Sequence, residues 1–278
     1  MTSTIQRLMG LAAIAAAAMI GAGSAVAGGS LKDGPMPEPQ RRCTLSANIA
    51  LASEYVFRGV SQTSEGAAVQ GGFDAACGKF YAGVWASNLD WGGTAAGDIA
   101  NIEMDWYAGF KPVTGRITWD LGVIYYTYPK SQDLFAGRDN NYVELKIGAS
   151  SEVWKGGTLS STLFYSPEYQ YETGNVWTSE TQFSQVLPKL GMFTPTFSAL
   201  AGYQRGTDNA YTTIVGTANG DDHYVYWNLG VTFAFLEKWS VDVRYWDTNL
   251  DNGANPAFCS GSVFQCDERV VATLKFTY

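Results

Sequence analysis

The chain has 278 residues, and its 18 Lys plus Arg against 26 Asp plus Glu give a net charge of −8. An acidic chain lacks the basic surface that phosphate backbones require, which excludes a nucleic-acid partner. Aromatic residues make up 14% of the chain. That share is high and is typical of the aromatic girdles of membrane barrels.

Residues 1–27 have the three parts of a secretory signal peptide. A single positive charge precedes the apolar run Leu8–Ile20, which is too short for a spanning helix of ~20 residues. The small residues Ala25–Ala27 form a cleavage site. We expect residues 28–42, with three prolines, to be a flexible periplasmic lead-in, and residues 43–278 to be one domain without a transmembrane helix.

Twelve segments with alternating apolar and polar residues follow. The clearest is 102–110, where apolar side chains alternate with Glu103 and Asp105. Period-two alternation predicts a β-strand whose two faces lie in different environments. The expected strands are 45–59, 69–76, 80–87, 102–110, 117–125, 143–147, 158–165, 176–186, 195–205, 225–233, 239–245 and 269–278.

The connections between these segments alternate in length. They are tight after even-numbered strands and mostly longer and polar after odd-numbered ones. This pattern predicts an all-β fold, an antiparallel up-and-down transmembrane β-barrel of about 12 strands with both termini in the periplasm. A soluble lipocalin-like barrel also alternates, but its charges would point outward. Phe276 and Tyr278, outward on the last strand, are expected to act as an assembly signal.

Three stretches carry a family resemblance. They are Ser53–Thr63 (SEYVFRGVSQT), Gln70–Asp74 (QGGFD) and Phe80–Asn88 (FYAGVWASN). Together they resemble the TorF family of proposed porins, in which Asp is usual where Glu54 stands and paired cysteines are not part of the pattern. The resemblance implies an outer-membrane pore.

Charged residues on the polar faces are expected to line the barrel interior, because a charge facing lipid near the midplane costs roughly 2–4 kcal/mol. In one interpretation they neutralise each other as salt bridges inside a plugged barrel. In the other, a basic wall (Arg58, Arg244, Arg269, Lys275) faces an acidic wall (Asp74, Glu103, Asp105, Asp120) across an open pore. Glu54, Asp242 and Lys146 blur that separation, and Glu144 is a further expected lumen residue.

Four cysteines in an exported protein indicate disulfides. Cys43 begins the first strand and Cys77 lies in the turn that ends the second, so both are expected at the periplasmic rim. Cys259 and Cys266 share the last outer loop. Cross-pairing would have to span ~25 Å, against the ~7 Å that a disulfide allows between Cα atoms, so we predict Cys43–Cys77 and Cys259–Cys266.

The predicted function is passive diffusion of small hydrophilic solutes through an outer-membrane channel. The alternative is a closed barrel whose surface loops bind a partner. His223, the single histidine, has no serine motif beside it, so we expect no enzyme, cofactor or metal site.

The expected partners are outer-membrane lipid, the barrel assembly machinery and the solutes; the sequence leaves the oligomeric state open. A mild cation preference is expected from acidic outer-loop residues, namely Asp90, Asp98, Asp208, Asp221, Asp222, Asp251, Asp267 and Glu268.

Overall fold

The computed structural model describes residues 43–94, 97–132, 137–214, 222–250, 259 and 264–278. The expected signal peptide and lead-in lie outside these residues. Within the described part of the chain, no helix has the length and apolar character needed to cross a membrane.

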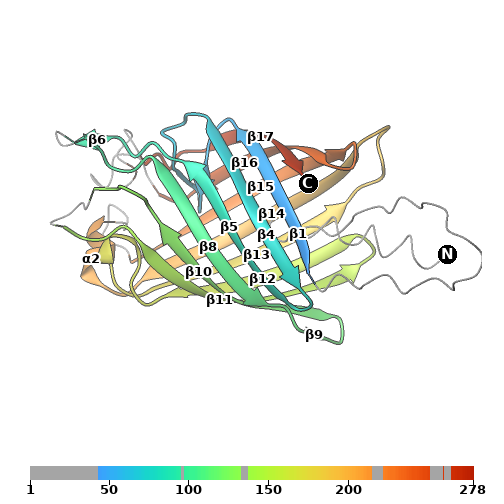
Figure 1. The fold of residues 1–278 in the computed structure, drawn as a ribbon, viewed down its shortest axis with the longest axis horizontal. Coiled ribbons are helices and arrows are strands. Elements are labelled where there is room, and N and C mark those ends of the chain that lie inside the picture. The colour runs from blue at the N-terminus through green and yellow to red at the C-terminus, as the bar shows by residue number, and fades with distance from the viewer. Residues whose placement is uncertain (1–42, 95–96, 133–136, 215–221, 251–258, 260–263) are drawn as a thin grey trace, which may run out of the picture.

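Twelve long strands form one closed antiparallel barrel, in which each strand pairs with its two neighbours along the chain (Figure 1). The ring closes where the last strand pairs with the first, with Ile49 opposite Phe276. The strands are β1 (Thr44–Ala52), β4 (Ala68–Cys77), β5 (Phe80–Asn88), β8 (Ile102–Phe110), β10 (Ile117–Thr127), β11 (Tyr142–Trp154), β12 (Gly157–Ser166), β13 (Val176–Val186), β14 (Thr194–Gly206), β15 (His223–Phe235), β16 (Trp239–Thr248) and β17 (Arg269–Thr277). The predicted fold is confirmed.

The outer surface of the barrel is apolar. Along β1, Leu45, Ile49 and Leu51 are exposed, and along β17 Val270 and Leu274 are exposed. Because alternate residues of a strand point to opposite faces, the polar residues between them face the interior. An apolar exterior around a polar interior is the arrangement of a transmembrane barrel.

The two ends of the barrel differ. Tight turns join the strands at the end where β1 begins and β17 finishes, and the short strand β9 (Val113–Thr114) lies there. The opposite end carries the long connections and their short elements, with β6 and α2 visible together on the left of Figure 1. These elements are β2 (Val56–Phe57), β3 (Val60–Ser61), β6 (Gly93–Thr94), β7 (Gly97–Asp98), the 3-10 helix η2 (Gln170–Glu172) and α2 (Asn209–Ile214). We call this end the loop end.

Interior glycines make room for tyrosine rings from neighbouring strands. A Cβ at Gly202 of β14 would lie 2.1 Å from the ring of Tyr226 on β15. A Cβ at Gly109 of β8 would lie 2.3 Å from the hydroxyl oxygen of Tyr81 on β5. The rings therefore lie flat over the glycine backbone, which lets large side chains fit inside a twelve-strand barrel.

The first predicted strand is wrong in its extent. The alternation predicts a strand from Leu45 to about Gly59, but β1 ends at Ala52 and residues 53–67 form the first long connection, which leads to β4. Tyr55 and Phe57 continue the alternation past the end of β1 because they belong to a separate small hairpin. A hairpin strand has the same period of two as a barrel strand, so alternation alone does not separate them.

Candidate functional site in the barrel lumen

A small hairpin from the first long connection occupies the lumen at the loop end. β2 and β3 pair antiparallel, with Phe57 opposite Val60, and Arg58 and Gly59 form the turn between them. Both turn residues have positive φ, 52° and 84°. This is the two-residue turn that fits the right-handed twist of a hairpin, and its second position favours glycine. We call residues 54–61 the lumen hairpin.

Arg58 at the tip of the lumen hairpin reaches across to β11. Its two terminal nitrogens each donate a hydrogen bond of 2.8 Å to the carboxylate of Glu144. Tyr126 donates to the same carboxylate at 3.0 Å, and Gln204 accepts a bond of 3.2 Å from Arg58. Arg58 and Glu144 are 4% and 1% exposed, so this bidentate pair is buried.

The position of Arg58 corrects the sequence interpretation, which placed it on the basic wall with Arg244. It lies on the inserted hairpin instead of on a barrel strand, and its partner Glu144 belongs to a different part of the wall. Burial by itself lowers the pKa of Arg58, but the Glu144 carboxylate outweighs burial, so the pKa is raised and the guanidinium stays charged.

The stem of the lumen hairpin is also anchored. Glu54, expected on the first strand, lies beyond its end and forms a buried ion pair with Arg269 of β17. Tyr55 donates a hydrogen bond of 3.3 Å to Glu103 of β8. Burial and then the charge of Glu103 raise the pKa of Tyr55, so its hydroxyl stays neutral and remains a donor.

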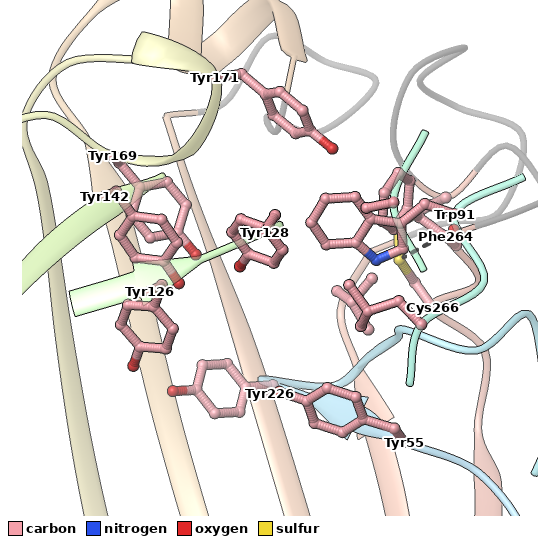
Figure 2. Packing of buried hydrophobic residues seen from close by; sticks show 14 of the residues in the cluster. Tyr55, Trp91, Tyr126, Tyr128, Tyr142, Tyr169, Tyr171, Tyr226, Phe264 and Cys266 are labelled. Carbon is pink, nitrogen blue, oxygen red and sulfur yellow. Dashed lines mark hydrogen bonds between the residues drawn. A yellow bond between two sulfur atoms is a disulfide. The ribbon is translucent and has the colours of Figure 1, made fainter. Parts of the chain in front are cut away.

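A cluster of buried aromatic side chains lies above the hairpin at the loop end. Figure 2 shows tyrosines from the barrel wall converging with residues of the long connections. Tyr126 and Tyr142 stack with ring centroids 4.3 Å apart, and Trp91 lies 4.7 Å from Tyr128. The indole N–H of Trp91 donates to Gln62, just after the hairpin. The cluster therefore packs the long connections onto the hairpin.

The sequence interpretation missed these aromatic residues. Tyr126, Tyr142 and Tyr226 stand at inward positions near the points where strands meet the long connections. Large aromatic side chains at inward positions of the loop end were an available signal that the connections pack into the barrel. Gln204, which bridges Arg58 and Tyr211, had no such signal.

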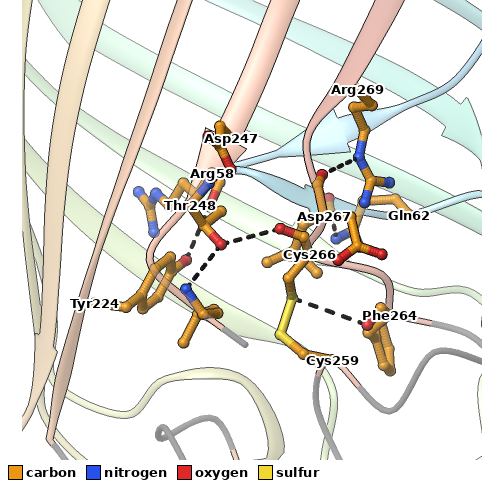
Figure 3. Close-up of a disulfide and its surroundings, with 12 residues drawn as sticks. Arg58, Gln62, Tyr224, Asp247, Thr248, Cys259, Phe264, Cys266, Asp267 and Arg269 are labelled. Atoms are coloured by element: carbon orange, nitrogen blue, oxygen red, sulfur yellow. Dashed lines mark hydrogen bonds between the residues drawn. A yellow bond between two sulfur atoms is a disulfide. The ribbon is translucent and has the colours of Figure 1, made fainter. Parts of the chain in front are cut away.

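The last long connection is tied to the same region. Cys259 forms a disulfide with Cys266, and the hydroxyl of Thr248 donates a hydrogen bond of 3.1 Å to the carbonyl oxygen of Cys266 (Figure 3). The ring of Phe264 lies 5.6 Å from that of Trp91. The disulfide therefore holds this connection against the aromatic cluster.

The other predicted disulfide lies at the opposite end. Cys43, just before β1, is bonded to Cys77 at the end of β4, with Cα atoms 4.1 Å apart. The described cysteines thus form the two pairs expected from topology. Cys43–Cys77 fixes the start of the barrel to its second strand.

The remaining predicted lumen residues stand at inward positions of barrel strands. Those on β4, β8 and β10 are Asp74, Glu103, Asp105 and Asp120, those on β11 are Glu144 and Lys146, and those on β16 and β17 are Asp242, Arg244, Arg269 and Lys275. Each except Arg269, which follows Glu268, stands between two uncharged neighbours that face outward. Their role in permeation stays a prediction.

The ion pairs favour neutralisation over two separate walls. Lys146 binds Asp120 at 2.9 Å, and Arg244 binds Asp242 at 2.8 Å. Lys146 and Asp242 do not fit the two predicted walls. In the structure they are the ion-pair partners of the wall residues Asp120 and Arg244, whose charges they neutralise. Asp74 accepts a hydrogen bond from Tyr107. The interior is charged but largely paired.

Charge at the loop end is mainly acidic where it is described. Asp90, Asp208, Asp267 and Glu268 are exposed. The carboxylate of Asp222 lies 2.7 Å from a guanidinium nitrogen of Arg205, with which it forms an ion pair, and 3.0 Å from Nδ1 of His223. The hydrogen bond from His223, followed by that from Arg205, lowers the pKa of Asp222. The side chain of Asp98 and residues Asp221 and Asp251 lie outside the part described.

The described residues contain no group of three or more His, Cys, Asp or Glu side chains suited to a metal ion.

The two aromatic residues at the end of the last strand pack at the barrel seam. Phe276 faces outward, with its ring centroid 4.9 Å from that of Trp239. Tyr278 is exposed, with the Lys238 ammonium 4.1 Å from its ring centre. The backbone of Tyr278 exchanges two hydrogen bonds with Ala47 and so completes the barrel seam. Whether these two aromatic residues direct assembly is a prediction.

A cavity of about 220 Å³ lies in the lumen beside the stem of the hairpin. Part of its lining comes from the hairpin stem, Glu54 to Val56. The other lining residues come from β16, β17, β1, β4 and β5, and they include Trp85, Trp246, Gln70 and Arg244.

Two solved structures with a similar fold are porins. The chain resembles the KdgM porin with a TM-score of 0.53 at 8% identity, over 84% of this chain and 98% of that one. It resembles the NanC porin with a TM-score of 0.50 at 8% identity, over 84% and 98% of the two chains. At such identity the likeness establishes the fold. No curated protein matches the chain in sequence.

A family model described as a bacterial protein of unknown function, Gcw_chp, matches residues 37–278. The match covers the whole barrel, including the stretch Ser53–Thr63 that carries the TorF resemblance; the TorF name itself stays a prediction. The chain belongs to the Gcw_chp family of bacterial proteins.

Proposed function

We propose that this protein is an outer-membrane channel for passive diffusion of small hydrophilic solutes, and that the lumen hairpin is its constriction. The observation that carries the proposal is the way in which the lumen is obstructed. The obstruction is a two-strand hairpin held at its tip by one ion pair, Arg58–Glu144. Such a separate element is removable without unpairing any barrel strand.

Three further observations support a channel. The barrel interior carries polar and charged side chains and contains a cavity beside the hairpin stem. The exterior is apolar, as lipid contact requires. The fold is shared with two porins. A passive channel needs no catalytic group, cofactor or metal, and we propose none.

The location follows from the same reasoning. We propose that the signal peptide expected in residues 1–27 directs export, that the assembly machinery inserts the barrel into the outer membrane of a Gram-negative bacterium, and that the loop end faces outward. The acidic residues of that end would give a modest preference for cations.

Planar-bilayer recordings test the proposal. Arg58→Ala with Glu144→Gln removes both charges of the tip, and the expected result is a conducting state that opens more often than in the wild type. Arg205→Ala, which removes an exposed rim charge, is the matched control and should behave as the wild type. Absence of conductance in all three proteins would favour a closed barrel whose loops bind a partner.

A further inference from the structure

The cavity beside the hairpin stem has two indole side chains on its wall. Trp85 stands on β5 and Trp246 on β16, and both are partly exposed inside the barrel. Trp85 packs edge-on against Tyr55, with ring centroids 5.3 Å apart, which fixes it beside the hairpin stem. Indole rings offer flat apolar faces together with one N–H donor.

The charged groups of this wall are already satisfied. The Arg244 guanidinium donates to Asp242, to Asn228 at 2.8 Å and to Ser198 at 3.0 Å. Glu54 is held by Arg269. A charged solute would have to displace one of these partners, and the free energy lost in doing so would offset what it gained.

Uncharged polar groups of the wall remain available. Among the described residues, the side chains of Gln70 and Thr273 and the indole N–H groups of Trp85 and Trp246 have no hydrogen-bond partner in the protein. An amide supplies both a donor and an acceptor, and so does a hydroxyl. These groups suit a solute with several hydroxyls.

The size of the cavity limits the solute. At about 220 Å³ it is smaller than the sites of roughly 300–1,000 Å³ that hold drug-sized ligands. A single sugar ring fits this scale, whereas an oligosaccharide does not fit inside it.

From these observations we propose that the cavity is a selectivity subsite for a small neutral polyhydroxylated solute of the size of a monosaccharide. The C–H face of the ring stacks on Trp246 or Trp85, and its hydroxyls bond to Gln70 and Thr273. The proposal rests on the channel function. Binding must be weak, because a permeating solute has to leave as well as enter.

Binding is measured separately from conduction. Refolded full-length protein in detergent is titrated with glucose, with glucuronate and with glucosamine, and tryptophan fluorescence is recorded. The expected result is saturable binding of glucose in the millimolar range, at least severalfold tighter than that of the two charged sugars. Trp246→Ala should weaken glucose binding on the order of tenfold.

Smaller changes guard against misfolding. Gln70→Leu and Thr273→Val keep the side-chain size, and each should weaken glucose binding by a few-fold. Trp106→Phe, at an exposed outward position, should leave the affinity for glucose unchanged. Heat-modifiable migration on gels verifies that each variant is folded.

The outcomes separate the two proposals. No saturable glucose signal, tighter binding of glucuronate than of glucose, or unchanged binding in Trp246→Ala, Gln70→Leu and Thr273→Val would overturn the subsite. Glucose binding with these residue effects but without conductance would leave the subsite standing and reject the channel. Conductance without glucose binding would support the channel and reject the subsite.

Discussion

The guanidinium of Arg58 and the carboxylate of Glu144 form two parallel hydrogen bonds of 2.8 Å across the lumen, although 86 residues separate them in the chain. This pair fixes the tip of the lumen hairpin to β11. The paired charges are buried, so loss of one partner leaves the other without compensation.

Removal of either partner should therefore destabilise the barrel, and removal of both should cost less than the two single losses added together. Arg58→Ala alone is expected to lower the free energy of unfolding by about 3–5 kcal/mol, because Glu144 stays buried and unpaired. Combined with Glu144→Gln, the loss should be smaller than the sum of the single losses. Urea unfolding of the four proteins of this double-mutant cycle measures the coupling; additive losses would show that the pair does not hold the hairpin.

Gly59 should be irreplaceable by alanine. Its φ is 84°, and a Cβ would lie 2.2 Å from Cγ2 of Thr248. We expect Gly59→Ala to push the lumen hairpin out and to expose Arg58, so that trypsin cleaves after Arg58 in the folded barrel. Gly115→Ala is the control: φ is 60° but nothing lies within 4 Å, so only backbone strain of about 1–2 kcal/mol applies. Equal resistance of both variants to trypsin would contradict this account.

Reduction of the last disulfide should loosen the aromatic cluster. Cys259→Ser with Cys266→Ser frees the connection that holds Phe264 beside Trp91. Hydrogen exchange is expected to rise in residues 264–268 and around Trp91, and to stay unchanged in β4. Removal of the Cys43–Cys77 bond is the matched comparison, and it should loosen the start of β1 and leave the cluster protected.

The cation preference is tested by charge removal at the loop end. Neutral amides in place of Asp90, Asp208, Asp267 and Glu268 should move the reversal potential toward anions, since these exposed carboxylates act over a Debye length of ~10 Å at 0.1 M salt. The shift should fade in 1 M salt. Glu237→Gln, in the tight turn before β16, should leave selectivity unaltered.

The seam of the barrel gives a prediction on assembly. Without Phe276 to Tyr278, Trp239 loses its ring contact and Ala47 loses two backbone bonds. We expect unfolded precursor to accumulate in the periplasm. Equal amounts of heat-modifiable protein in the outer membrane with and without these residues would contradict this.

Much of the barrel was predictable because its two faces meet different environments. In 102–110, the alternation around Glu103 and Asp105 predicted both the strand and its inward face. The lumen hairpin was not predictable from the same signal, since Tyr55 and Phe57 continue the period of the first strand. Gly59 was the local indication of a turn.

The partners of the lumen charges were beyond sequence pattern. Alternation indicates which face of a strand a residue occupies. The distance between two side chains across the lumen depends on the barrel diameter and on any segment, such as the lumen hairpin, that enters the lumen. Arg58 was therefore assigned to the wrong wall, and its pairing with Glu144 was missed. Lys146 and Asp120, on adjacent strands, were closer to prediction because neighbouring antiparallel strands follow in sequence.

Single-channel recording of a barrel without the lumen hairpin tests the central claim most directly. Residues 55–61 would be replaced by a short glycine linker between Glu54 and Gln62, with folding verified by heat-modifiable migration. We predict brief, small openings in the wild type and a larger, persistently open conductance in the variant. A folded variant that conducts no better than the wild type would contradict the claim that the hairpin is the constriction of a channel.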